Sequence, residues 1–216
     1  MIEIRELTRA EEIVNTVSHG VGICLAVPAF ILLVKYARSY GDLWHLISFT
    51  VFGATLVMLY TASTLYHGFP KGELKRKLKI FDHACVYLLI AGTYTPITLL
   101  ALRNTLGITI LSIVWLAAVT GIIVKMFYIN RNVVLSTLVY VGLGGLILVA
   151  IKPLLAALSS TSFRLLVLGG IFYAVGTIFF ALQKIKHNHG IWHLFVLAGS
   201  ICHFFTVLYL LPNFSG

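Results

Sequence analysis

Histidines are concentrated near the C-terminal end of the chain, where His187, His189 and His193 begin a long apolar run that also contains His203. His189 and His193 are separated by one helical turn, so on a helix they lie on one face. His203 continues the same broad stripe about 15 Å further along a straight helix. Imidazoles inside a membrane helix are costly unless they meet a partner, so other helices must supply one.

Polar residues that could be these partners occur at the ends of three other apolar stretches. They are Ser18 and His19 at the start of the first stretch, Ser63 and His67 at the end of the second, and Asp82 and His83 at the start of the third. If the stretches cross a membrane in alternation, all these ends and the start of the last stretch fall on the same side. Random placement would scatter them over both sides, so the sequence indicates a shared site.

Three neutral imidazoles with an open fourth position are the usual ligand set of a catalytic zinc ion. His67, His189 and His193 can supply this set for Zn²⁺, one from one helix and two from a facing helix. We interpret Ser63 and Asp82 as the catalytic residues. Ser63 would polarise a substrate oxygen or hydrogen-bond a neighbouring group, and Asp82 would orient a water molecule and accept its proton. The combination predicts a hydrolase, and its place among membrane helices indicates a membrane lipid as substrate.

Each of these residues also has a simpler interpretation. A single histidine inside a membrane protein is more often a hydrogen-bonded packing residue than a metal ligand. Asp82 could instead be the N-cap of the third helix or an ion-pair partner of nearby basic residues. His203 is too deep for the same metal, and we expect it in a polar network within the bundle. The roles of His19 and His83 stay open, and His45 lies far from the others.

The composition requires that these residues sit in a membrane-embedded bundle. Of 216 residues, 59% are hydrophobic and only 11% are charged, and the mean hydropathy is +0.98, whereas soluble domains carry about 25% charged residues. The net charge of +9 is therefore a topology signal, and we expect no nucleic-acid partner. The three cysteines all lie in apolar runs and do not indicate a disulfide framework.

Seven apolar stretches are long enough to cross the hydrocarbon core, which needs roughly 20 residues. The connections between them are short, so we expect a single all-α membrane domain over residues 1–216. The approximate spans are 16–34, 43–66, 84–102, 105–124, 133–151, 165–182 and 191–211.

The basic residues favour an orientation with the N-terminus in the cytoplasm and the C-terminus outside. In this orientation the inside segments hold Arg5, Arg9, Lys71, Lys75, Arg76, Lys77, Lys79, Lys125, Arg131, Lys184 and Lys186, and the outside segments hold only Lys35, Arg38, Arg103, Lys152 and Arg164. Cytoplasmic loops of membrane proteins carry such an excess of Lys and Arg. The histidine cluster would then lie on the cytoplasmic side.

Prolines and glycines mark the interiors of several spans. We expect Pro28 to bend the first span, and Pro96 to kink the third by removing a backbone donor. Glycines in the fifth and sixth spans are expected to permit close helix approach. They are Gly142, Gly144 and Gly145 in the fifth span and Gly169, Gly170 and Gly176 in the sixth.

Several motifs resemble those of the hemolysin III family, the bacterial branch of the progestin and adipoQ receptor (PAQR) family. They are Glu12, Asn15, Ser18 and His19, the run Ser63 to His67, the run Phe81 to His83, the run Gly92 to Pro96, and the run His189 to His203. The resemblance covers essentially the whole chain. It implies seven transmembrane helices with the N-terminus inside, in the bacterial plasma membrane.

The resemblance also implies a site and an activity. In the adiponectin receptors three histidines hold zinc near the cytoplasmic side, and by resemblance these are His67, His189 and His193, with Ser63 and Asp82 as the family's serine and aspartate. That branch implies a ceramidase-like hydrolase. The hemolysin name implies an alternative, a pore-forming, toxin-like protein that causes cytolysis. A receptor-like sensor with a structural metal is a third reading, and a homo-oligomer is compatible with each.

Overall fold

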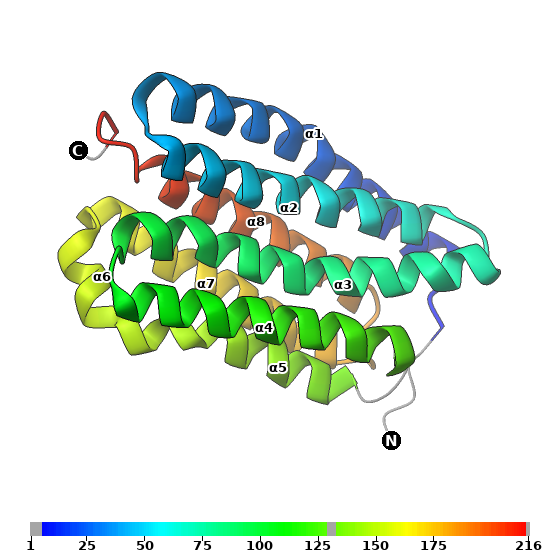
Figure 1. Cartoon of the computed structure of the whole chain (residues 1–216). Coiled ribbons are helices and arrows are strands. Elements are labelled where there is room, and N and C mark those ends of the chain that lie inside the picture. Colours follow the sequence, from blue (N-terminus) through cyan, green and yellow to red (C-terminus); the bar gives the residue numbers. More distant parts are fainter. Residues whose placement is uncertain (1–5, 129–132, 215–216) are drawn as a thin grey trace.

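The computed structural model describes residues 6–128 and 133–214, and in them seven helical segments are long and apolar enough to cross a membrane. The elements are α1 (Arg9–Tyr40), α2 (Leu43–Gly68), α3 (Glu73–Pro96), η1 (Ile97–Ala101), α4 (Thr105–Tyr128), α5 (Val133–Gly145), η2 (Leu146–Ala150), α6 (Ile151–Ala157), α7 (Ser160–Ala181) and α8 (Asn188–Leu208) (Figure 1). The prediction of an all-α bundle with seven spans is confirmed. Its orientation stays a prediction, and Arg5 and Arg131, which contributed to it, lie outside the described residues.

The first helix is longer than its apolar run because a polar cap starts it early. Thr8 and Glu11 form a capping box, in which the Thr8 hydroxyl accepts from the Glu11 backbone N–H and the Glu11 carboxylate accepts from the Thr8 N–H. Such reciprocal bonds satisfy two backbone donors at a helix start. α1 therefore begins at Arg9 and contains Glu12 and Asn15 within regular helix.

The third helix also starts before its apolar run. The third apolar span is predicted to start at residue 84, but α3 begins at Glu73, so the basic residues from Lys75 to Lys79 form its first turns. The N-cap position is Gly72. Asp82 therefore lies well inside the helix, and the alternative that it caps the third helix is wrong.

The fifth span is not one continuous α-helix. α5 ends at Gly145, and the chain passes through the 3-10 turn η2 before it continues as α6. The Tyr94 hydroxyl of α3 lies at this interruption, 2.8 Å from the carbonyl oxygen of Leu143, 2.9 Å from that of Gly144 and 2.8 Å from the backbone nitrogen of Ile147. Backbone polar groups inside a membrane must be paired, and Tyr94 supplies the pairing here.

The two prolines behave differently. Directly after Pro96 the third span changes from α-helix to the π-helical segment η1, so the regular helix ends where the missing backbone donor predicted an irregularity. Pro28 lies inside the continuous helix α1, and the bend expected there stays a prediction.

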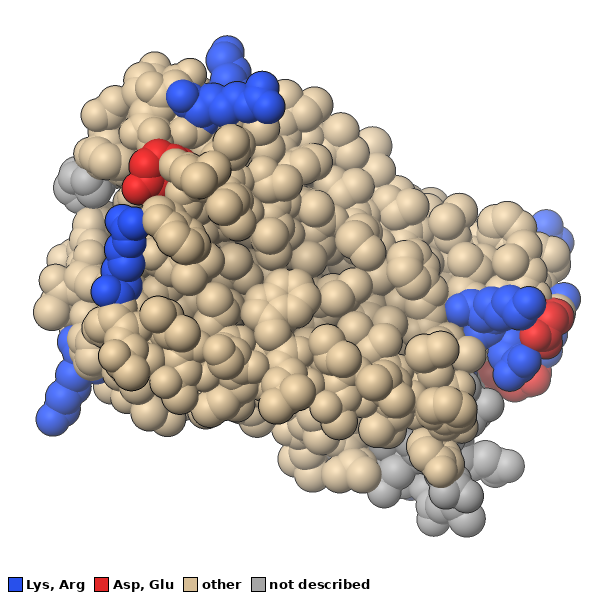
Figure 2. All heavy atoms as spheres, viewed as in Figure 1, with Lys and Arg blue, Asp and Glu red and all other residues tan. Residues whose placement is uncertain are grey.

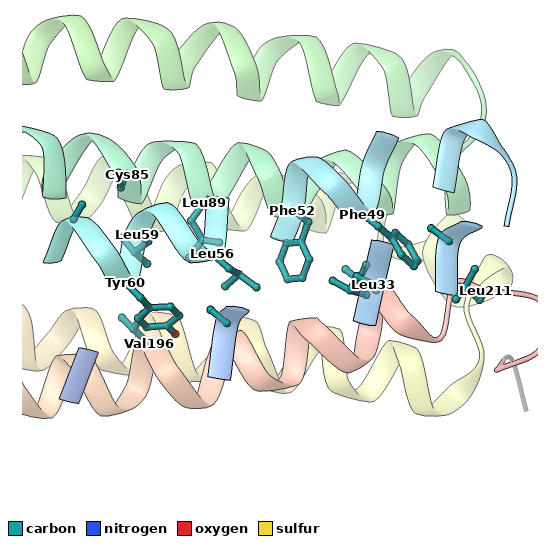
Figure 3. Packing of buried hydrophobic residues seen from close by; sticks show 14 residues of the cluster. Leu33, Phe49, Phe52, Leu56, Leu59, Tyr60, Cys85, Leu89, Val196 and Leu211 are labelled. Carbon is teal, nitrogen blue, oxygen red and sulfur yellow. The ribbon is translucent and has the colours of Figure 1, made fainter. Parts of the chain in front are cut away.

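The helices form a closed bundle in which α3 is central. α1 packs along α2, α2 along α3, and α7 along α8, which also contacts α1 (Figure 1). One buried apolar cluster joins α1, α2, α3 and α8 and includes Leu33, Phe52, Tyr60 and Val196 (Figure 3). A second cluster joins α3 to α4, the fifth span and α7. In the most apolar window of α3, 67% of the residues are buried, the largest share in the seven described spans.

The outer surface matches a protein surrounded by lipid. On the face drawn in Figure 2, Lys and Arg side chains gather toward the two ends and an uncharged band lies between them. Large apolar side chains such as Ile31, Leu116 and Leu138 are exposed. So much exposed apolar surface would be unfavourable in water and is favourable in lipid, so the chain is a multi-pass membrane protein.

The six glycines of the fifth and sixth spans divide into two groups. A Cβ atom at Gly169 or Gly176 would collide with side chains of α8, which confirms the predicted close approach of α7 and α8. A Cβ atom at Gly142, Gly144, Gly145 or Gly170 would meet nothing within 4 Å. For these four the packing prediction is wrong, because space is left open beside them.

Candidate metal site

The three predicted ligands come together between the end of α2 and the start of α8. One ring nitrogen from each of His67, His189 and His193 lies within 4.8 Å of the other two, and the Nε2 atoms of His67 and His189 are 3.1 Å apart. Two nitrogens bound to a tetrahedral zinc ion at 2.0–2.1 Å would be roughly 3.3 Å apart. The residues present therefore fit a metal ion such as zinc.

A residue of α1 binds the His67 ring on the side that faces away from His189. Its Nδ1 atom is 2.6 Å from the Glu12 carboxylate, and because a carboxylate only accepts, Nδ1 carries the proton. The Nε2 lone pair is then left on the side of His189. The other Glu12 oxygen is 2.9 Å from Lys75 Nζ, so the carboxylate itself is fixed by a partly buried cation.

The His193 ring is held in the same way. It is fully buried, and its Nδ1 atom is 2.9 Å from Ser18 Oγ. The Ser18 hydroxyl donates its proton to the Asn15 carbonyl oxygen at 2.9 Å, so toward His193 it must accept from Nδ1–H. The Nε2 atom of His193 is therefore the one that carries the lone pair a metal needs.

Ser63 and Asp82 lie at the same wall as the ligands. Both are buried, and both line the cavity that His189 and His193 also line. The Ser63 hydroxyl neighbours the Asp82 carboxyl group, yet it has no hydrogen bond of good geometry to any described residue. An unpaired buried hydroxyl is unusual in a native fold and is available to a ligand or a water molecule. The catalytic roles of both residues stay predictions.

The remaining histidines near this region occupy different positions. His19 stacks on His193 with ring centroids 3.4 Å apart, and neither of its nitrogens has a partner among the described residues. His83 lines the cavity. His203 makes a 3.2 Å contact from Nε2 to the Leu166 carbonyl oxygen, while its Nδ1 atom has no hydrogen-bond partner among the described residues, so the expected polar network stays a prediction.

A cavity of about 420 Å³ extends from the histidines into the bundle between α3, α5, α7 and α8. Ser63, Asp82, His189 and His193 mark one region of it, and most of its other lining residues are apolar. They include Leu89, Ile97, Leu148, Leu154 and Val167, together with Gly144, Gly145 and Gly170. The open space beside these three glycines is therefore this cavity.

Sequence reasoning missed Glu12 and Lys75, which the structure places next to the ligands. Glu12, Asn15 and Ser18 are spaced three residues apart, so they share one face of a helix, and this spacing was the available signal. Glu12 and Asn15 were noted only as part of a family motif. Their partner on α2 lies more than fifty residues away and could not be read from α1 alone.

Comparisons with known proteins agree with this architecture. The sequence profile of the family described as Haemolysin-III related matches residues 7–204. The chain is 49% identical over 202 residues to the hemolysin-3 homolog of Bacillus subtilis, covering 94% of this chain and 95% of the relative. It is also 48% identical over 206 residues to the hemolysin-3 of Bacillus cereus, and this match covers 95% of this chain and 94% of the relative.

A more distant relative comes from Homo sapiens. The human monocyte to macrophage differentiation factor is 28% identical, over 85% of this chain and 78% of the relative, and it supports the link to the PAQR family. No solved structure gives a significant match. The chain therefore belongs to the haemolysin-III-related family of multi-pass membrane proteins.

Proposed function

We propose that this protein is a zinc-dependent hydrolase that cleaves an amide or ester bond of a membrane lipid. The observation that carries the proposal is the three-histidine group, two of whose members, His189 and His193, line an otherwise largely apolar cavity inside a membrane bundle. Such a cavity suits a molecule with one polar, reactive group and a long apolar chain.

The chain's own residues would divide the work as follows. His67, His189 and His193 would hold the ion, which when bound supplies Lewis acidity and makes a water molecule more acidic. The Asp82 carboxylate orients the attacking water and takes its proton. The Ser63 hydroxyl, which makes no hydrogen bond of good geometry to a described residue, donates a hydrogen bond to the substrate carbonyl oxygen.

The cavity would hold the apolar chain of the substrate. Its volume of about 420 Å³ lies within the range of about 300–1,000 Å³ that is usual for small-molecule sites. Three of its lining residues, Val141 and Leu148 of the fifth span and Ile171 of α7, are exposed rather than buried, so the cavity is not closed off there. A lipid would therefore enter sideways from the bilayer between α5 and α7. The adiponectin-receptor branch of the wider family implies a ceramidase-like hydrolase, so ceramide-like N-acyl lipids belong in the substrate screen, but Trp192 and His83 depart from the receptor pattern and the substrate is not carried over from it.

Membrane lysis is the alternative function, because the Bacillus cereus relative carries the name hemolysin. A water-filled path would require polar residues along the cavity. The lining here is mainly apolar away from the histidines, which disfavours such a path within one copy of the chain. The alternative then requires a pore formed between copies of the chain in a homo-oligomer. Ion leakage from liposomes that contain the protein would reveal such a pore.

Metal analysis combined with a lipid-hydrolysis screen tests the proposal. Protein purified in detergent should contain about one zinc ion per chain, and His67→Ala and His193→Ala should lose it. Asp82→Asn should keep the zinc and lose hydrolysis. His45→Ala, which removes a histidine from the opposite end of α2, is the control and should change neither. Turnover that survives in Asp82→Asn, or folded wild type without metal, would refute the proposal.

A further inference from the structure

We infer that the first helix, which provides none of the three ligands, positions the metal centre through Glu12 and Ser18, here called the α1 clamp. The clamp fixes which nitrogen of His67 and of His193 carries a proton and where each ring points. This inference rests on the proposed metal site. It assigns a function to two residues of α1 that otherwise belong only to a sequence motif.

Each clamp residue binds the ring nitrogen that faces away from the other ligands. A neutral imidazole has one N–H and one lone pair, so a bond that engages Nδ1–H leaves Nε2 as the metal ligand. Glu12 is 2.6 Å from Nδ1 of His67, and Ser18 Oγ is 2.9 Å from Nδ1 of His193. Partners of this kind orient metal-binding histidines and make them better ligands.

The clamp residues are themselves held in place. Lys75 binds the second oxygen of Glu12 at 2.9 Å and also donates to the carbonyl oxygens of Tyr66 and Phe69, at 2.9 and 3.0 Å, where α2 ends. Ser18 is fixed by its bond to the Asn15 carbonyl oxygen. Neither side chain is therefore free to rotate away from the ligand that it binds.

The neighbouring residue Glu11 extends the role of α1 to the start of α8. Its Oε1 atom accepts a hydrogen bond from the His187 backbone N–H at 3.0 Å. His187 immediately precedes α8 and has a left-handed backbone, with φ of 58°, a conformation that a residue with a side chain rarely adopts without support. α1 thus contacts both ligand-bearing helices at the ends that carry the ligands.

The same bonds could serve only to hold helices together. In that case their loss would lower the thermal stability of the metal-free protein and would weaken metal binding only through unfolding. A positioning role predicts the opposite pattern, with a large loss of metal affinity and little change in the metal-free melting temperature. The two roles can therefore be separated by measuring both quantities.

The experiment uses the full chain purified in detergent, stripped of metal and titrated with zinc against a competing chelator. Glu12→Gln and Ser18→Ala should each weaken zinc binding by about 10–100-fold. Ser18→Thr keeps the hydroxyl and should restore most of the affinity. Cobalt bound in place of zinc reports ligand geometry, and its visible absorption should change in Glu12→Gln and Ser18→Ala.

Two matched variants serve as controls. Thr16→Val removes a hydroxyl of α1 that bonds only the Glu12 carbonyl oxygen, and Glu6→Gln removes an exposed carboxylate that pairs with Lys71; both should bind zinc as the wild type does. Clamp variants that bind zinc normally, or that lose affinity only as their metal-free melting temperature falls, would overturn the inference while leaving the metal site intact. Absence of zinc binding in folded wild type would instead overturn the proposed function, and the clamp with it.

Discussion

The two sides of the histidine site are built in opposite ways. On the side of α1, polar side chains fill the space behind the ligands, and Glu12, Ser18 and His19 all contact a ligand ring. On the side of α5 and α7, the glycines that line the cavity leave the space open, and a Cβ atom at Gly144 or Gly170 would meet nothing within 4 Å. The comparison suggests that one side holds an ion in a fixed geometry and the other leaves room for a chain.

The packing of glycines shows the same contrast. Gly22 of α1 lies against the ring of Tyr60 so closely that a Cβ atom would overlap it, and Tyr60 is fully buried with its hydroxyl bonded to Ser200 at 2.8 Å. Tyr60 belongs to the apolar cluster of α1, α2, α3 and α8 (Figure 3). The same residue type therefore permits close packing on one side of the molecule and a cavity on the other.

Filling the open side should have the largest effect, and on lipid binding rather than on folding. Gly170→Leu places a side chain in the cavity, so the longest acyl chains should lose about 10–200-fold in affinity, the usual effect of misfitting even one methylene. Shorter chains should still bind. Competition between fatty acids of graded length, on purified protein, measures the shift.

Gly142→Leu is the matched control for this experiment. Gly142 lies on α5 and is equally open to an added side chain, but it does not line the cavity, so its variant should keep the wild-type length profile. An unchanged profile in Gly170→Leu would show that no chain lies there. That result would refute the proposal that the cavity holds the acyl chain of a lipid, and it would not bear on the metal site.

The sequence predicts which histidines come together but does not predict the cavity, for a physical reason. Helical periodicity places His189 and His193 on one face. His67 lies at a helix end that falls on the same side of the membrane as theirs. Local sequence patterns were therefore enough to group the three histidines. Whether Gly144 or Gly170 packs or lies open depends on which helix comes near it, and the chain around the residue does not contain that information. Lys75 was missed because the basic run that contains it reads as a connection, although it forms the first turns of α3.

Alanine substitutions at the two kinds of glycine should change stability with opposite sign. Gly22→Ala forces the buried Tyr60 to move, which should cost about 1–3 kcal/mol in the free energy of unfolding. Gly170→Ala meets open space, so the higher helix propensity of alanine should leave stability unchanged or raise it by up to about 1 kcal/mol. Unfolding in mixed detergent measures both. Equal losses in the two variants would contradict the contrast between a filled and an open side.

The break in the fifth span should depend on Tyr94, because its hydroxyl serves three backbone groups there. Tyr94→Phe leaves those groups unpaired next to the cavity and should cost about 1–3 kcal/mol of stability. Tyr140→Phe is the comparison variant, since the Tyr140 hydroxyl contacts a single backbone group, the His83 carbonyl oxygen at 3.4 Å, beside its side-chain neighbour Tyr87, and it should cost less. Thermal unfolding compares the stability of the two variants. An equal or smaller loss in Tyr94→Phe would show that the backbone groups at the break in the fifth span do not depend on the Tyr94 hydroxyl.

The smallest effect should come from Lys75, which acts on the His67 ring through Glu12. Lys75→Met removes the cation beside Glu12 but keeps most of the side-chain volume, so Glu12 can still bind His67 and merely becomes less well oriented. The direct bond between Glu12 and His67 stays in place, so zinc affinity should fall by less than the about 10–100-fold loss expected in Glu12→Gln.

Lys71→Met is the control for Lys75→Met, because Lys71 pairs with Glu6 where both side chains are more than three-quarters exposed, and its loss should leave zinc affinity unchanged. A Lys75→Met variant as defective as Glu12→Gln would mean that the cation, and not the carboxylate, governs the ligand ring. The filled side would then owe its rigidity to the link between α2 and α3 rather than to α1.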